Sequence, residues 1–128
     1  MTQIKYIYKC EICGNIVEVL HQGPGQLVCC GQPMKLMEAM ESDPEKGEKH
    51  LPIIEESDDG FLVKVGEITH PMTEEHHIEW IELVSEKGIY RKHLKANDKP
   101  EALFEKPREK IISVREYCNL HGLWETKI

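Results

Sequence analysis

The chain of 128 residues is long enough for one ordinary domain, or for one small domain followed by a medium one. Its net charge of −7 argues against nucleic acid as a partner, because binding phosphates needs a basic surface. No apolar run is long enough to span a membrane, and the N-terminal residues lack the apolar core of a signal peptide. We therefore expect a cytoplasmic protein with no membrane partner.

Four of the five cysteines lie in two pairs near the start of the chain. Residues 5–9 and 16–20 are rich in β-forming side chains and predict two short strands. The segment Cys10-x-x-Cys13-Gly14 between them is typical of a metal-binding knuckle, in which glycine lets the backbone fold under the ion and point its amide hydrogens at sulfur. In a cytosolic chain, thiols clustered in this way are interpreted as metal ligands or redox groups before disulfides.

The thiols of Cys10, Cys13, Cys29 and Cys30 suit one tetrahedral ion, and both zinc and iron accept such a set. A bound ion would also explain how so short a segment folds, since it supplies free energy that a small core lacks. The second pair departs from ordinary zinc ribbons, which use two spaced pairs. Side chains of adjacent residues tend to point apart, so Cys29 and Cys30 can bind one ion only if the backbone turns sharply.

Residues 41–47 are polar and contain proline and glycine, so they predict a linker or an exposed loop. We place the domain boundary near residue 38, which gives an N-terminal domain of residues 1–38 and a second domain of residues 39–128. The second domain contains short strand-like segments separated by turn residues: 50–54, 61–65, 78–84, 89–94, 102–105 and 111–117. Segment 78–84 also suits an amphipathic helix, but its β-branched and aromatic content favours a strand. The pattern predicts an all-β fold with a small antiparallel sandwich.

The second domain also carries a set of residues that bind metals: His50, His70, His76, Cys118 and His121. Four imidazoles and one thiol exceed the four ligands that close a structural zinc site. Imidazole suits iron, copper and zinc, while a thiolate is a soft, electron-donating ligand. If all five groups converge, a metal that prefers six ligands keeps one open position, where chemistry occurs.

The strongest local fragment is the Cys-x-x-His pair at 118 and 121, because two ligands three residues apart can reach one ion. Spacing alone leaves alternatives open: His77 and His93 compete as ligands, and Cys118 also suits a small buried apolar position. Thr73 is placed to cap a single helical turn through His76, which would aim that imidazole away from the strand after it.

Taken together, these motifs resemble a known family. Cys10-Glu11-Ile12-Cys13 with Cys29-Cys30-Gly31 is similar to the desulforedoxin domain. Residues 47–54, 66–80 and 117–124 are similar to the neelaredoxin-like catalytic domain of superoxide reductase. In this order the two parts resemble desulfoferrodoxin, the two-iron superoxide reductase, over nearly the whole chain. The resemblance implies a desulforedoxin-like domain followed by an immunoglobulin-like β-sandwich.

The resemblance implies one iron ion in each domain, and neither haem nor flavin. The four cysteines would hold the first iron. The second, catalytic iron would lie in a square of imidazoles with a thiolate at the apex and an open sixth position, its ligands being His50, His70, His76, His121 and Cys118. Superoxide would be reduced there by one electron to hydrogen peroxide, with no oxygen evolved.

Two charged residues match the Glu-Lys-His motif of the family. Lys49 would attract the superoxide anion and hold a water that donates a proton, and Glu48 would occupy the sixth position of ferric iron. From the residues alone, both also suit a solvated charged loop. His77 and Leu123 depart from the family pattern, in which tyrosine and a second histidine are common. His77 leaves open which of the adjacent histidines binds, although the Glu-Glu-His register favours His76.

The resemblance also implies partners: superoxide as substrate, a rubredoxin-like electron donor, and a second copy of the chain in a homodimer. The setting implied is the cytoplasm of an anaerobic or microaerophilic prokaryote. Two other hypotheses stand beside superoxide reductase. In one, the protein is an electron carrier whose two irons only shuttle electrons. In the other, it is a non-enzymatic zinc module with a β-sandwich interaction domain, which leaves the histidines and Cys118 unexplained.

Overall fold

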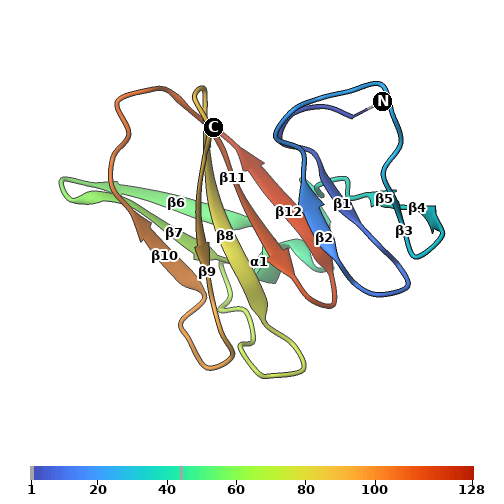
Figure 1. Cartoon of the computed structure of the whole chain (residues 1–128). Coiled ribbons are helices and arrows are strands. Elements are labelled where there is room, and N and C mark those ends of the chain that lie inside the picture. The colour runs from blue at the N-terminus through green and yellow to red at the C-terminus, as the bar shows by residue number, and fades with distance from the viewer. Residues whose placement is uncertain (1, 44) are drawn as a thin grey trace. The chain divides into compact units, whose positions relative to one another are not determined.

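The computed structural model describes residues 2–43 and 45–128, apart from the side chain of Glu48. These residues form two compact units that divide between Glu38 and Ala39 (Figure 1). Regular structure is almost entirely β-strand, and the described part of the chain has one helix, the single turn α1 (Gly47–His50). No helix in that part is long and apolar enough to cross a membrane. The prediction of an all-β fold is confirmed.

The first unit is organised around β1 (Ile7–Lys9), the central strand of a three-stranded antiparallel sheet. β2 (Ile16–Glu18) and β5 (Lys35–Leu36) pair with its two edges. β3 (Val28–Cys29) and β4 (Gln32–Pro33) form a separate hairpin. Among the described residues of this unit, the buried apolar side chains are Ile7, Cys10 and Val19. So small a core needs a further source of stability, which a bound metal ion can supply.

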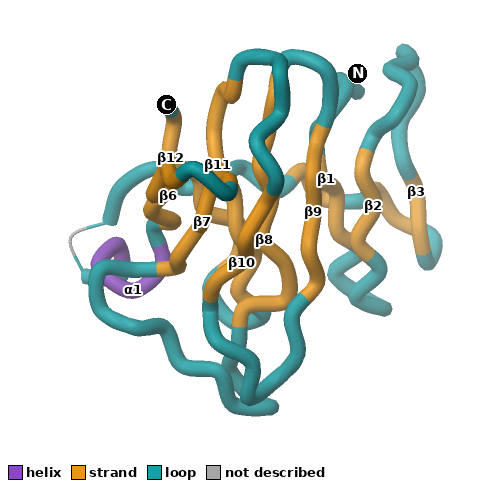
Figure 2. The backbone as a smooth tube through the Cα atoms, turned by 90° about the vertical axis from the view of Figure 1, so that its left-hand side faces the viewer, coloured by secondary structure: helices purple, strands orange, loops and turns teal. Residues whose placement is uncertain are grey.

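The second unit is a sandwich of two antiparallel sheets (Figure 2). The three-stranded sheet has the order β10 (Glu101–Phe104), β7 (Gly60–Val65), β6 (Pro52–Ser57). The four-stranded sheet has the order β12 (Gly122–Lys127), β11 (Ile111–Cys118), β8 (Ile78–Ser85), β9 (Ile89–His93). Seven antiparallel strands divided three and four between two sheets are the immunoglobulin-like arrangement that was predicted.

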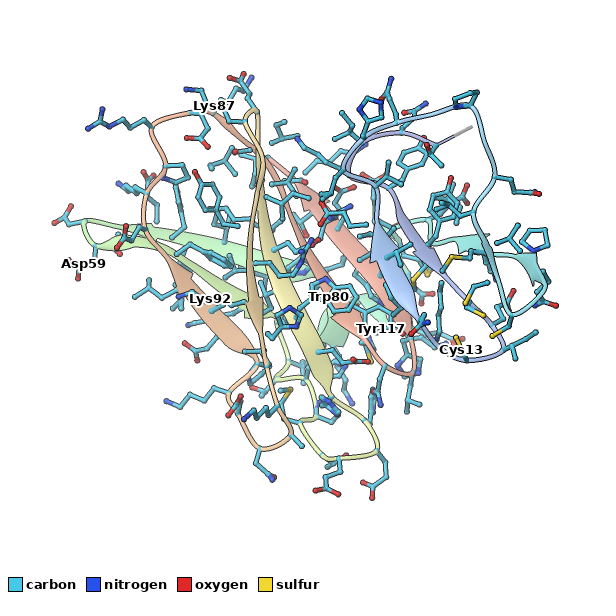
Figure 3. All side chains as sticks on the ribbon, in the orientation of Figure 1. Cys13, Asp59, Trp80, Lys87, Lys92 and Tyr117 are labelled. Carbon is cyan, nitrogen blue, oxygen red and sulfur yellow. The ribbon has the colours of Figure 1, made fainter. Side chains whose placement is uncertain are left out.

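The core of the sandwich lies between the two sheets. Successive side chains of a strand point to opposite faces, so β11 sends every second residue inward, and so does β8 except at the register shift between Ile78 and Trp80. The buried core cluster consists of Val63, Val65, Ile78, Ile81, Leu83, Ala102, Phe104, Val114 and Cys118. On the other face of the same strands Trp80 stacks on Tyr117, with ring centroids 4.5 Å apart (Figure 3). Cys118 ends β11, so the core extends to one of the candidate ligands.

The start of the first predicted strand in this unit is wrong. The prediction began at His50, but His50 ends α1 and β6 begins at Pro52. The carboxylate of Asp43 accepts the backbone N–H groups of Glu45 and Lys46, at 2.8 and 2.9 Å, and this turns the chain into α1. A local side-chain hydrogen bond therefore overrides the strand-like composition of the segment.

Of the other local predictions in this unit, one was confirmed, one strand was missed and one helical turn was wrong. Segment 78–84 is a strand, as its composition predicted, and β12 was missed. The helical turn expected over residues 73–76 is also wrong, because these residues form a bend. The capping hydrogen bond is nevertheless present, since Thr73 Oγ1 accepts the backbone N–H of His76 at 3.1 Å.

Candidate metal centres

The four cysteines of the first unit come together, as the sequence analysis expected of ligands to one ion. Their sulfur atoms all lie within 4.8 Å of one another. The Sγ atoms of Cys13 and Cys29 are 3.6 Å apart, and those of Cys29 and Cys30 are 3.9 Å apart. Cys10 is buried, whereas Cys13 and Cys30 are exposed. The cluster is therefore anchored in the small core on one side and open to solvent on the other.

The adjacent cysteine pair takes the sharp turn that shared binding requires. Cys30 has a φ of +53°, and Gly31 follows with a φ of +77°. A left-handed conformation is disfavoured for a residue with a Cβ atom, so the backbone at Cys30 is strained. This turn brings the sulfurs of Cys29 and Cys30 to one side, where they meet the first pair.

Hydrogen bonds divide the four thiols into unlike environments. The backbone N–H of Cys13 donates to Cys10 Sγ, and that of Asn15 donates to Cys13 Sγ, both at 3.5 Å. The bond from the Cys13 backbone is the largest cause that lowers the pKa of Cys10 to about 6. Hydrogen bonding with the Cys13 thiol, followed by the other thiols, raises the pKa of Cys30 to about 12. A cation among the sulfurs would hold Cys30 as the thiolate in spite of this raised pKa, as a tetrathiolate metal site requires.

Four histidines of the second unit form a square. Adjacent rings of the square meet edge to face. Their centroids are separated by 4.6 Å (His50–His70), 4.7 Å (His70–His76), 5.0 Å (His76–His121) and 4.7 Å (His121–His50). His50 and His76 face each other across the diagonal at 6.2 Å, with ring planes 27° apart. α1, the loop before β8 and the turn after β11 supply these side chains, so distant parts of the sequence meet at one point.

Ring nitrogens of the square point inward. Nδ1 of His50 is held by the carbonyl of Lys46 at 2.8 Å, and Nδ1 of His70 by the carbonyl of Pro71 at 2.6 Å. Their Nε2 atoms are thereby free to meet, 3.1 Å apart. Nδ1 of His121 lies 3.0 Å from Nε2 of His50. A carbonyl on one ring nitrogen, with the other directed at a common centre, is the usual arrangement of a metal-binding imidazole.

The remaining nitrogen and the thiol complete the cluster. Nε2 of His76 is buried and has no hydrogen-bond partner among the described residues. Cys118 is fully buried, and its sulfur lies 3.8 Å from Nδ1 of His121. Ligand atoms of His50, His76, Cys118 and His121 all lie within 4.8 Å of one another, and His70 joins them through its contact with His50. An orphaned buried nitrogen within a set of metal-binding groups fits a bound metal ion.

The pKa shifts in this cluster have burial as their main cause. Burial lowers the pKa of all four imidazoles, that of His70 to about 4, so the rings are neutral at pH 7. Neutral imidazole is the form that binds metals. Burial also raises the pKa of Cys118, against the backbone N–H groups of Leu120 and His121, which lower it. A cation would hold Cys118 as the thiolate.

The two competing histidines lie outside the square. Nδ1 of His77 is 2.9 Å from the carbonyl of Thr73. A ring nitrogen of His76, and not one of His77, lies within 4.8 Å of the candidate ligand atoms of His50, Cys118 and His121. His93 ends β9 and is exposed, with its ring 6.3 Å from that of Trp80. The Glu-Glu-His register therefore selected the histidine that the structure brings into the cluster.

The two charged residues of the Glu-Lys-His motif lie in α1. Lys49 is exposed, and its positive charge acts on His76, whose pKa is lowered first by burial and then by the charges of His121, His77 and Lys49. The ammonium group thus lies close enough to the square to affect it. The prediction for the side chain of Glu48 falls outside the described residues.

A buried carboxyl group near the square was missed by the sequence analysis. Glu116 is fully buried, and neither of its carboxyl oxygens has a hydrogen-bond partner in the described structure. Burial raises its pKa well above the usual range. The signal was available, because residues two apart on a strand share a face and Glu116 precedes the inward-facing Cys118 by two.

The fold and the clusters define the class of this protein: an all-β chain with two candidate metal centres of unlike ligand chemistry, one of four thiols and one of imidazoles with a thiol. The family model of desulfoferrodoxin matches residues 42–127, and the model of the desulfoferrodoxin N-terminal domain matches residues 2–37. The chain belongs to the desulfoferrodoxin family, which confirms the resemblance drawn from its motifs.

Individual relatives agree over most of the chain. The desulfoferrodoxin of Nitratidesulfovibrio vulgaris is 57% identical over 94% of this chain and 94% of its own. The superoxide reductase of Pyrococcus abyssi is 39% identical and covers 73% of this chain and 96% of its own. The crystal structure of the superoxide reductase from Treponema pallidum is similar, with a TM-score of 0.76, 28% identity, and coverage of 95% of this chain and 96% of that chain.

Proposed function

We propose that this protein is a superoxide reductase that reduces superoxide by one electron to hydrogen peroxide. The observation that carries the proposal is the square of four neutral imidazoles beside a buried thiol. Ferrous iron bound there would supply the electron, and five protein ligands leave one of six positions for the substrate. Relatives named superoxide reductase, from Pyrococcus abyssi and Treponema pallidum, support the assignment.

Electrostatics of the site favour an anionic substrate in spite of the net charge of −7. The imidazoles are neutral, so a divalent ion with one thiolate leaves the site at about +1. Lys49 adds a positive charge at the exposed side of α1, beside the square. Local positive charge of this kind raises the concentration of an anion at the site and offsets the field of the acidic surface.

The roles of individual residues follow from the same proposal. His50, His70, His76, His121 and Cys118 hold the catalytic iron. Lys49 attracts superoxide and holds the water that donates a proton, and Glu48 takes the sixth position of ferric iron. Residues 1–38 form the tetrathiolate iron domain with Cys10, Cys13, Cys29 and Cys30 as ligands, and residues 39–128 form the catalytic domain. A rubredoxin-like protein re-reduces the iron, and the chain works as a homodimer in the cytoplasm.

The test begins with protein purified without oxygen. Two irons per chain are expected, with tetrathiolate absorption bands from the start and a second thiolate-to-ferric band after oxidation. Rapid mixing with superoxide should give one hydrogen peroxide per superoxide and no oxygen. Cys118→Ser should abolish the second band, whereas His93→Ala, at an exposed histidine outside the square, should leave it unchanged.

Two other outcomes would assign the chain to a different class of protein. A second centre that superoxide oxidises no faster than superoxide disproportionates on its own would show an electron carrier. Zinc in the second centre, with no band after oxidation, would show a zinc module. Either result overturns the proposed function.

A further inference from the structure

Asn119 lies between two candidate ligands, Cys118 and His121, and its side chain reaches across to the loop that carries a third. Its Oδ1 accepts the backbone N–H of His77, and its Nδ2 donates to the carbonyl of Glu75, both at 3.0 Å. Its own backbone N–H donates to the carbonyl of His77 at 3.2 Å. Asn119 thus forms hydrogen bonds with the residues on either side of His76.

These hydrogen bonds form where the pairing of β11 with β8 ends. Strands β11 and β8 pair as far as Cys118 and Ile78, and the register between them shifts just before that last pair. Beyond that pair, one backbone hydrogen bond joins the two segments in the described residues, from the N–H of Asn119 to the carbonyl of His77. The side chain of Asn119 supplies two hydrogen bonds at the next position, so the connection between the Cys118 end of β11 and the loop before β8 is continued by an amide group.

The ring of His76 depends on its backbone for its position more than the rings of His50 and His70 do. The imidazoles of His50 and His70 are each held by a backbone carbonyl on Nδ1. In the described residues no hydrogen bond from a protein group holds the ring of His76, and its buried Nε2 is without a partner. The position of this imidazole therefore follows its backbone, which Thr73 holds from one side through the N–H of His76 and Asn119 from the other.

We propose that Asn119 is a positioning residue that sets His76 against Cys118 in the second metal centre. The inference rests on the proposed function only in taking this cluster to bind iron. Groups that orient metal ligands typically change metal affinity by about 10- to 100-fold when they are removed. Loss of the Asn119 amide should lower iron affinity by a factor in that range and act through His76 alone.

A double-mutant cycle on the whole chain tests this. Ferrous iron affinity of the second centre is measured without oxygen by competition with a chelator, for wild type, Asn119→Ala, His76→Ala and the double variant. Asn119→Ala should weaken binding about 10- to 100-fold in the wild-type background and have no further effect in the His76→Ala background, since the pair is coupled. The thiolate-to-ferric band of oxidised Asn119→Ala should shift, because the ligand opposite His50 has moved.

Two further variants serve as controls. Asn119→Asp keeps the size and the acceptor for the His77 N–H but loses the donor to Glu75, so its affinity should lie between wild type and Asn119→Ala. If metal-free Asn119→Ala melts at a lower temperature than wild type, Asn119→Asp takes its place in the measurement of iron affinity. Leu120→Ala truncates a side chain that is 60% exposed in the same loop and should bind iron as wild type does.

Additive losses in the double variant, or unchanged affinity in Asn119→Ala, would overturn the inference. These results are separate from the fate of the proposed function. Wild-type protein that binds two irons but does not reduce superoxide rejects the function and leaves the role of Asn119 standing. Wild-type protein whose second centre binds no iron rejects both.

Discussion

His50 stacks on Trp124, with ring centroids 4.9 Å apart and ring planes 23° from parallel. Trp124 is fully buried in β12, and its indole N–H donates to the carbonyl of His121 at 3.1 Å. One side chain thus supports two of the histidines in the square, by a ring face and by a hydrogen bond. The strand that carries it was missed in the sequence, yet it joins the ligand cluster to the core of the sandwich.

Removing this support should cost stability in two separable parts. Trp124→Phe keeps an aromatic face for His50 but leaves the His121 carbonyl without its donor, which should lower the free energy of unfolding by about 1–3 kcal/mol. Trp124→Ala also opens a cavity and should cost about 3–5 kcal/mol. Urea unfolding of the metal-free protein measures both. Equal losses for the two variants would contradict the separate role of the hydrogen bond.

Lys49→Ala should slow the reaction with superoxide while leaving both irons bound. Removing one exposed positive charge beside the site should reduce the second-order rate constant by about 3- to 10-fold at low salt and flatten its dependence on ionic strength. Stopped-flow mixing at several salt concentrations measures this. Lys87→Ala, at an exposed lysine on the turn between β8 and β9, is the matched control. A rate constant equal to that of wild type would remove Lys49 from the mechanism.

Loss of the first metal should unfold only the first unit. Cys13→Ser removes one exposed ligand of the tetrathiolate cluster and leaves the packing of Ile7, Cys10 and Val19 untouched, so metal content should fall from two ions to one. Hydrogen exchange should show residues 2–38 unprotected and the sandwich unchanged. Cys118→Ser is the reciprocal control, which should lose only the second ion. Full protection of residues 2–38 in Cys13→Ser would show that the small core suffices.

Glu116 should make the stability of the metal-free protein fall as pH rises. Its buried carboxyl, whose pKa is raised by burial, stays protonated in the folded state. In the unfolded chain it ionises above about pH 4.3, so the unfolded state is favoured increasingly from there toward neutral pH. Glu116→Gln removes this titration, so its unfolding free energy, measured in urea from pH 5 to 8, should rise relative to that of wild type by an amount that grows with pH. Glu105→Gln, at an exposed glutamate, should retain the wild-type slope.

Local patterns in the sequence predicted the features that depend on neighbouring residues. Period-two alternation and β-branched content identified most strands of the sandwich, including the ambiguous segment that became β8. The prediction missed β12 because its mixture of charged and apolar residues gives little local indication of a strand. This strand is defined by its pairing with β11 across the turn at Gly122. α1 was missed because it lies where a predicted loop meets a predicted strand, and two hydrogen bonds to the side chain of Asp43 turn the chain there.

The sequence by itself determined the two groups of candidate ligand residues and the all-β class. The cysteines of the first centre lie close along the chain, so their spacing alone indicates a shared ion. Only the tertiary structure decided that the histidines meet. His50 contacts His70 across 20 residues and His121 across 71, and these contacts form only when the two sheets pack and bring α1 to the end of β11. Spacing carries no information about such closure, because it is the burial of the core, not local propensity, that holds those segments together.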